Sequence, residues 1–322
     1  MDVIELRKRF LVEFVTNRFH YHDEDAKRVR ESDFWVKRFI LHKNQGSNAA
    51  FYHMKDTFKW KKSFGVHDFN PIDIPREVYQ LSPIFSYLPD KKGVIPIYIR
   101  CRMIIKIDLF EEKMKQYFTH IMDRVDNKAR KPRGWSLVFD CQGAGIENAN
   151  FELMFFAMSV IEKHFPMQPS YVIAYGIPWM LKPFIKMGLS MIPEEAMKLL
   201  KFIDCKEDLM DIIPSEHLPD FMGGTGKQDY RSVPQNAQSC QEVGKRLFKL
   251  SEGQVQQMME PIQYLIDSSL NNNDDVSSTS SKEGEDGSNC QRKTSLSSET
   301  SPSSQSHKNR NNKPLSFIEE FD

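Results

Sequence analysis

The sequence predicts an α/β protein in which a helical N-terminal part precedes a mostly parallel β-sheet covered by helices, with a polar tail after it. Three observations carry this prediction. Apolar residues recur at helical spacing over residues 1–80, strand-like runs alternate with helical stretches over 81–226, and serine and asparagine dominate residues 268–312. Strands separated by helices of this length are typical of βαβ units, which form parallel sheets covered on both faces.

Residues 1–80 are expected to form a helical N-terminal subdomain of three or four helices. Leu6, Phe10 and Phe14 follow one another at one-turn intervals, and later apolar residues keep the period of an α-helix. Asp23 and Asp33 each stand at the start of a helical stretch, and we expect them to be N-caps.

Residues 81–226 are expected to form the sheet and its covering helices. Gly93 opens the first apolar run, and Trp135 and Tyr171 open two more. Asn148 or Asn150 is the expected N-cap of the second helix. The expected order is a strand at 93–101, a helix at 109–127, a strand at 135–141, a helix at 151–164, a strand at 171–175, an apolar segment at 178–192, and a stretch at 197–204 that fits a strand or a helix.

The C-terminal part is expected to divide in two. Residues 227–267 are expected to form C-terminal helices, because residues 240–267 show helical spacing, interrupted by Gly253 and Pro261. Residues 268–322 have too few apolar side chains over most of their length to offset the entropy of ordering, so a disordered tail is expected. Within this tail, residues 314–322 regain aromatic and acidic character.

Charge and composition argue against some classes of function. Lys and Arg number 44, as do Asp and Glu, so no net field favours nucleic acid, and we expect no nucleic-acid partner. The sequence has no apolar run of transmembrane length and no signal-peptide core at its start. A soluble, cytosol-facing chain is therefore expected.

The sequence contains no strong motif for catalysis. The turn with Gly143 and Gly145 follows a strand, as a dinucleotide-binding loop does, but Asn148 stands where the third glycine belongs. Cys141 and Cys205 lie near strand ends without a histidine partner identifiable in the sequence. The nine histidines have no metal-ligand spacing and are expected on the solvated surface. We therefore expect no enzyme activity, no cofactor and no metal site.

The segment at 178–192 has more apolar surface than one covering face requires. Pro183 is expected to kink or restart a helix there, and Gly188 to loosen its second half. Lys182 and Lys186 lie one turn apart, and with Trp179 they suit a membrane interface. Two interpretations stay open, a core helix and a lid that contacts a membrane. The apolar residues that would face a ligand are Trp179, Met180, Phe184, Ile185, Met187, Leu189 and Ile192.

Several motifs occur in an order that resembles the CRAL-TRIO lipid-transfer family over residues 20–226. They are Trp60-Lys61-Lys62, the strands at 94–100 and 135–140, Ile177-Pro178-Trp179, and Leu218-Pro219 followed by Gly223-Gly224. The resemblance implies that residues 81–226 form a CRAL-TRIO lipid-binding domain. It also implies that residues 178–192 are a gate helix, which opens at a membrane and closes over a pocket for one phospholipid or other hydrophobic molecule.

The resemblance also bears on the cargo. Members that bind phosphatidylinositol carry a Tyr-Pro-Glu segment whose glutamate holds the inositol. The matching residues here are Phe165, Pro166 and Met167, so that acid is lost. Lys198 falls near the position of the family's headgroup lysine and is the candidate headgroup residue. Phosphatidylinositol is therefore not assigned as the ligand.

Within this family, the whole chain most resembles members that carry a motile sperm domain. In those members a linker, a major-sperm-protein β-sandwich and a membrane anchor follow the CRAL-TRIO domain, and the sandwich binds acidic peptide motifs at endoplasmic-reticulum contact sites. This sequence looks like a short isoform or a truncated form that lacks both parts, so tethering is not carried over.

The expected function is a non-catalytic module that binds or transfers a lipid and docks on membranes or lipid droplets. Its expected location is cytoplasmic or peripheral on membranes, with the endoplasmic-reticulum membrane implied for full-length relatives. The alternative is a protein-interaction module with a vestigial lipid pocket, whose partners the sequence does not name.

Overall fold

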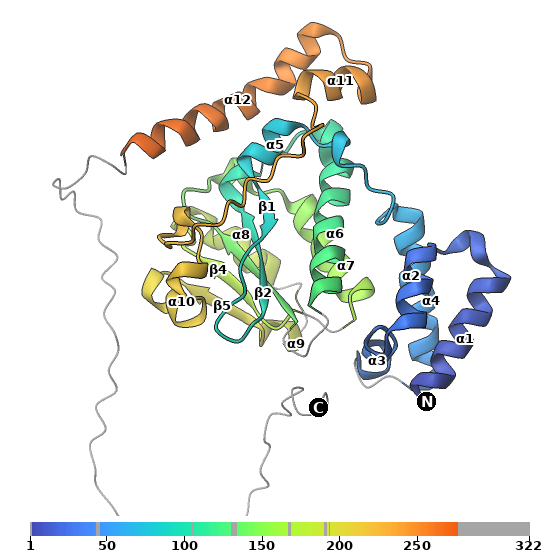
Figure 1. Ribbon diagram of the computed structural model, residues 1–322. Coiled ribbons are helices and arrows are strands. Elements are labelled where there is room, and N and C mark those ends of the chain that lie inside the picture. Colours follow the sequence, from blue (N-terminus) through green and yellow to red (C-terminus); the bar gives the residue numbers. More distant parts are fainter. Residues whose placement is uncertain are drawn as a thin grey trace, which may run out of the picture.

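The computed structural model describes residues 2–42, 46–104, 106–129, 134–166, 169–189, 192 and 194–275. Figure 1 shows three parts within these ranges: a helical bundle at the N-terminal end, a central sheet with its covering helices, and two C-terminal helices. This arrangement agrees with the α/β architecture that the sequence predicts.

The N-terminal bundle contains the helices α1 (Val3–Thr16), α2 (Asp23–Glu31), α3 (Asp33–Leu41) and α4 (Ser47–Phe64). Their apolar stripes meet in a core of their own, because each stripe follows the helical period. That core includes Leu6, Phe10, Phe14, Val29, Val36, Phe39, Met54 and Phe58.

The N-cap prediction is wrong by one residue at both helices. His22 and Ser32 hold the N-cap positions, and Asp23 and Asp33 are the first helical residues. The Nδ1 atom of His22 accepts a hydrogen bond from the backbone N–H of Glu24 at 3.1 Å. A carboxylate in the first turn still stabilises a helix, because it faces the positive end of the helix dipole.

The central sheet has five strands in the order β1 (Ile84–Ser86), β2 (Ile95–Arg100), β3 (Trp135–Asp140), β4 (Val172–Tyr175) and β5 (Leu200–Ile203). β1 pairs antiparallel with β2, and the other neighbours are parallel. The sequence patterns miss β1 because three residues are too few to show an alternation. The ambiguous stretch at 197–204 contains a strand.

Six helices connect the described strands or lie beside them: α5 (Arg76–Leu81), α6 (Glu111–Lys128), α7 (Phe151–His164), α8 (Lys182–Leu189), α9 (Glu194–Met197) and α10 (Lys206–Ile212). The expected cap at Asn150 is confirmed, since its side chain accepts a hydrogen bond from the N–H of Leu153 at 3.0 Å. α6 and α7 cover one face of the sheet through Phe118, Met122, Leu153 and Val160. α10 and the segment after it cover the other face.

Buried ion pairs join the N-terminal bundle to α6. Asp123 accepts hydrogen bonds from both terminal nitrogens of Arg28 at 2.9 Å and from Nζ of Lys61 at 2.6 Å. Arg38 pairs in the same two-pronged way with Asp126 and also donates to the carbonyl oxygen of Pro166. Each of these buried charges therefore has a partner of opposite charge across the contact between the bundle and α6.

The turn that follows α10 requires both of its neighbouring glycines. Gly223 has a φ of +77°, in the left-handed region that favours glycine. A β-carbon at Gly224 would lie 2.0 Å from the carbonyl oxygen of Leu218, so no side chain fits there. This close approach lets Leu218 become fully buried under the sheet.

The C-terminal helices are α11 (Cys240–Phe248) and α12 (Glu252–Asp275), which pack on α5 through one apolar stripe. The chain breaks at Lys249, with a φ of +56°, rather than at Gly253, and α12 continues through Pro261. α12 also extends past residue 267, where the tail is predicted to begin. The remaining residues of the predicted tail, 276–322, lie outside the described residues.

Candidate functional site

Helix α7 has two apolar faces, and only one of them is fully buried. Leu153 and Val160 are buried against the sheet. On the opposite side, Met154, Phe155 and Met158 are only half-buried, although they share a continuous stripe. A covering helix needs one apolar stripe, so the second stripe is apolar surface available for another contact.

The sheet also leaves part of its α7-side face incompletely covered. The strand register places Phe139, Ala174 and Phe202 in one row across β3, β4 and β5. Burial falls along this row: Phe139 packs against the core, Ala174 is half-buried and Phe202 is 51% exposed. Leu200, on the same face of β5, is half-buried as well. The half-covered side chains of α7 and of these strands are together called the apolar bed, defined as Met154, Phe155, Met158, Ala174, Leu200 and Phe202.

Helix α8 packs on the second face of α7. The rings of Phe184 and Phe151 lie 5.7 Å apart, and Gly188 approaches the side chain of Met154. Phe184, Ile185 and Leu189 share this inner face of α8 and are half-buried. Ile192 is half-buried too, whereas residues 190, 191 and 193 lie outside the described residues.

The outer face of the same segment presents a different set. Trp179 is 77% exposed and Met187 is 48% exposed, and Met180 lies outward as well. Lys182 and Lys186 are exposed beside them. The structure therefore divides the residues that the sequence assigns jointly to a ligand pocket: Trp179, Met180 and Met187 point outward with the two lysines, and Phe184, Ile185, Leu189 and Ile192 form the inner set.

Two positions concern the predicted headgroup site: Lys198, the candidate headgroup residue, and Met167, where the family's acid is lost. Lys198 is exposed in the turn between α9 and β5, near the far edge of the apolar bed. Met167 lies outside the described residues. Its neighbour Pro166 is held by Arg38 of α3, through the carbonyl contact described above.

The turn after β3 is filled by the chain itself. A β-carbon at Gly145 would overlap the carboxylate of Glu147, and Asn148 accepts a hydrogen bond from the N–H of Gly145 at 2.9 Å. The amide of Asn148 also donates to the carbonyl oxygens of Arg102 and Ile104. These contacts join the loop to itself and to the segment after β2, which favours a structural turn.

The ends of β2 and β3 bring two thiols and a carboxyl together. The Sγ atoms of Cys101 and Cys141 are 3.8 Å apart, and their contact, with burial, raises the pKa of the Cys101 thiol. Burial also raises the pKa of Asp140 to about 6, although Arg100 and Arg102 oppose the shift. A thiol kept protonated is a poor nucleophile. Cys205 stands apart from this pair, at the residue before α10.

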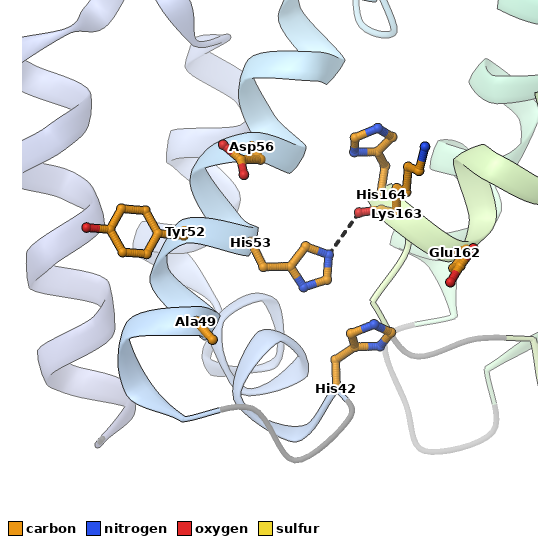
Figure 2. Close-up of a pocket in the computed structure, with 8 residues that line it drawn as sticks. All are labelled: His42, Ala49, Tyr52, His53, Asp56, Glu162, Lys163 and His164. Atoms are coloured by element: carbon orange, nitrogen blue, oxygen red, sulfur yellow. Dashed lines mark hydrogen bonds between the residues drawn. The ribbon is translucent and has the colours of Figure 1, made fainter. Parts of the chain in front are cut away.

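A hollow of about 550 Å³ separates the bundle from the end of α7 (Figure 2). Its walls are His42, Ala49, Tyr52, His53 and Asp56 on one side and Glu162, Lys163 and His164 on the other. The sequence does not predict this hollow, because its two walls are more than a hundred residues apart in the chain.

The histidines of this hollow correct the expectation of a solvated surface. His42 is buried, and His53 bonds through Nε2 to the carbonyl oxygen of Lys163 at 2.9 Å (Figure 2). The ring of His164 stacks on that of Trp60 at 4.1 Å, and burial lowers its pKa to about 4. These contacts hold the bundle against α7. The lining includes none of residues 178–192, so this hollow is not the predicted lipid pocket.

Residues 80–224 match the family model described as the CRAL/TRIO domain. Over 142 residues the chain is 22% identical to Phosphatidylinositol transfer protein CSR1 of Eremothecium gossypii; the match takes in 44% of this chain and spans a third of that protein's length. The crystal structure of Sfh5 superposes with a TM-score of 0.51 and 12% identity, and covers 72% of this chain and 85% of Sfh5. The predicted CRAL-TRIO fold is therefore confirmed.

The second face of α7 is the part of the site that sequence reasoning missed. A signal for it exists, since apolar residues surround most of the helix between Phe151 and Ile161. A helix with apolar residues on all sides is usually buried on all sides. Here only one face of α7 is fully buried, and the second is half-buried under α8. This difference follows from the packing of α8 and the strands, which the sequence does not show.

Proposed function

Taking residues 80–224 as a CRAL/TRIO domain, we propose that this chain binds one lipid or other hydrophobic molecule on the apolar bed, without catalysing a reaction on it. In this proposal α8 is the lid. Its inner residues Phe184, Ile185 and Leu189 cover the acyl part of the ligand, and Lys198 lies where a polar headgroup would emerge.

The half-buried second stripe of α7 is the observation that carries this proposal. Burial of apolar surface stabilises a protein by about 25 cal/mol per Å², so a stripe left half-buried lacks stabilisation that tighter packing would supply. A hydrophobic ligand between α7, α8 and the outer strands would supply the missing contacts. The similarity to a phosphatidylinositol transfer protein supports a lipid as that ligand.

The energetics of loading favour exchange at a membrane. A lipid that moves from a bilayer to the bed exchanges one apolar environment for another, so the water-transfer free energy of roughly 0.8 kcal/mol per CH₂ nearly cancels. What remains is the free energy of opening α8 and of recognising the headgroup. Selectivity for one lipid headgroup over another is therefore expected to depend on a few polar residues.

Docking on the membrane is assigned to the outer face of residues 179–187. Trp179 and Met187 would enter the interfacial layer, and Lys182 and Lys186 would meet anionic headgroups. In the part of the chain that the structure describes, no helix combines the length and apolar character needed to span a bilayer.

Native mass spectrometry of the purified full chain tests the binding proposal. We expect one lipid mass per chain, either co-purified or taken up from vesicles. Phe155→Asp with Phe202→Asp would place two charges in the bed and abolish uptake. Tyr264→Asp, on the exposed side of α12, is the matched control and would leave uptake unchanged. A clean ligand-free mass with no uptake would contradict the proposal and favour a protein-interaction module with a vestigial pocket.

We further propose that the chain is cytoplasmic and reversibly peripheral on membranes or lipid droplets. The resemblance to members with a motile sperm domain makes the endoplasmic-reticulum surface the first to examine. A fluorescent fusion of the full chain should shift to these surfaces when cells are loaded with fatty acid, and Trp179→Asp with Met187→Asp should prevent the shift. A diffuse signal under both conditions would contradict this part of the proposal.

A further inference from the structure

Helix α1 presents a second apolar stripe to solvent, on the side opposite the bundle core. Ile4 is 68% exposed, Val12 is 61% exposed and Val15 is 76% exposed. With the half-exposed Leu11, they follow the spacing i, i+7, i+8 and i+11, which places them on one face of the helix. Phe19, in the turn that follows, is also exposed. An exposed surface helix normally turns polar residues outward, so this stripe fits a contact with another segment.

The stripe forms a shallow groove with a basic lining. A hollow of about 560 Å³ lies along it, lined by Ile4, Arg7, Lys8, Leu11, Val12, Val15 and Thr16. The lining contains two basic residues, Arg7 and Lys8, and no acidic residue, and Arg7 also pairs with Asp33 of α3 beside the groove. A segment that fills it should therefore carry apolar side chains with acidic neighbours.

The chain contains such a segment in residues 314–322, Pro-Leu-Ser-Phe-Ile-Glu-Glu-Phe-Asp. At helical spacing, Phe317, Ile318 and Phe321 share one face, and Pro314 suits a first helical turn. Glu319, Glu320 and Asp322 flank that face with three negative charges. Apolar anchors at this spacing are the usual way in which a short helix fills a groove.

We propose that residues 314–322 dock into the α1 groove of the same chain, with Phe317, Ile318 and Phe321 against the apolar stripe and the acidic residues beside Arg7 and Lys8. The connection is long enough. Residues 276–313 could span more than roughly 100 Å when extended, against a width of about 50 Å for a folded unit of this size.

The connection also sets how strong the contact needs to be. A linker of this length gives an effective concentration of the order of 1 mM. A segment that binds in trans with a Kd near 0.1 mM would therefore be docked about nine-tenths of the time in the intact chain. The proposed contact covers α1 and leaves the apolar bed, α8 and its outer face untouched.

Site-specific photo-crosslinking in the full chain tests the proposal. Benzoylphenylalanine incorporated at Phe317 keeps an aromatic ring there and reacts with whatever the ring contacts. We expect most crosslinked peptides to map to residues 4–16. Incorporation at Ser304, in the connecting segment, is the matched control and should give no preferred partner. Val12→Asp should lower the yield about tenfold, whereas Tyr264→Asp should not.

Further measurements distinguish docking of the chain's own segment from occupation of the groove by a second copy or by a membrane. Mixing unlabelled and ¹⁵N-labelled chains distinguishes contacts within a chain from contacts between chains, and mixed-isotope products would overturn the proposal in favour of a second copy. Crosslinks spread over the surface, or a yield that Val12→Asp leaves unchanged, would also overturn it. So would loss of vesicle binding in Val12→Asp with an unaltered crosslink pattern, which would identify the groove as a membrane contact. Glu319→Lys with Glu320→Lys should lower the yield, and added salt should do so too.

Discussion

Gly188 of α8 lies so close to α7 that a β-carbon at this position would be 3.3 Å from the terminal methyl of Met154. The methyl is the flexible end of an unbranched side chain and can shift by the few tenths of an ångström that an alanine requires. The glycine is therefore replaceable, and it weakens the last turn of α8, because glycine is less favourable than alanine in a helix by up to about 1 kcal/mol.

Gly188→Ala is expected to slow lipid transfer between vesicles. A more rigid α8 would open less often, and about 1 kcal/mol on the opening equilibrium corresponds to roughly a fivefold lower rate. The thermal midpoint should stay equal or rise slightly. A fluorescent-lipid transfer assay measures the rate. Gly253→Ala on α12, where a β-carbon would meet open space, is the control for a general gain in helix stability. Equal rates in Gly188→Ala and the wild type would show that opening of α8 does not limit transfer.

Lys182→Gln with Lys186→Gln is expected to weaken binding to anionic vesicles. Each lysine near an anionic surface contributes about 1 kcal/mol, so their joint loss should raise the Kd roughly thirtyfold. Binding to neutral vesicles should change little, because no surface charge is present. Vesicle sedimentation at physiological salt measures both. Lys91→Gln with Lys92→Gln removes two exposed charges from another loop and serves as the control. An equal loss in the two double variants would argue for a non-specific charge effect.

Asp123→Asn is expected to lower the free energy of unfolding by about 3–5 kcal/mol at pH 7, because it removes the counter-charge of the buried Lys61 and the two-pronged partner of Arg28, which keeps only its longer contacts to Glu24 and Asp25. Urea unfolding followed by circular dichroism measures the change. Asp23→Asn, which breaks the exposed pair with Arg18, is the control and should change stability far less. A small change in Asp123→Asn would mean that water reaches the buried arginine.

The effect of Asp123 should depend on pH in a defined direction. Burial alone would raise the pKa of this carboxyl, but the charges of Lys61 and Arg28 outweigh burial and lower it well below its usual value. The unfolded chain therefore takes up the proton first as the pH falls. The stabilisation is fully present above about pH 4, where an unfolded Asp ionises, and is lost on further acidification. The difference between wild type and variant should shrink in that range.

Asp140→Asn is expected to show the opposite trend. Burial raises the pKa of Asp140 to about 6, so the folded state holds its proton more tightly than the unfolded state does. The wild type therefore loses stability as the pH rises from about 4 to 6, and the loss persists above that. At pH 7.5 the variant should be more stable by roughly 2–3 kcal/mol, and at pH 4 the two proteins should be alike. Urea unfolding at both pH values checks this, and equal stability at pH 7.5 would mean that Asp140 ionises freely.

Much of the fold follows from local patterns. The helix at 151–164 and its cap at Asn150 agree with the structure, because amphipathic period and capping chemistry act within one or two turns. The strands at β2, β3 and β4 are likewise predicted to within a few residues. β1 is missed because it is short and owes its existence to pairing with β2. The N-caps are displaced by one residue because both aspartates already belong to the first helical turn, and His22 and Ser32 before them hold the cap positions.

The candidate site is less predictable than the fold. The sequence identifies residues 178–192 as unusually apolar, but a list of residues does not say which side of a helix meets a neighbour. The sequence assigns both Phe184 and Trp179 to the ligand pocket, yet Phe184 contacts Phe151 and Trp179 faces solvent. The hollow at His53 and His164 escapes prediction for the same reason, because it forms only where two distant helices meet.

By itself, the sequence determined most of the order of helices and strands, with β1 missed and β5 left ambiguous, as well as the turn at Gly223 and Gly224, and with them the CRAL-TRIO fold. Each of these depends on residues close together in the chain, whose spacing and backbone freedom can be read directly. Only the tertiary structure decided which charges are buried and which apolar faces stay open. Lys61 is buried and Lys62 is not, because Asp123, a distant residue on α6, lies beside only one of them. Burial depends on such long-range neighbours, and so does the half-covered apolar bed.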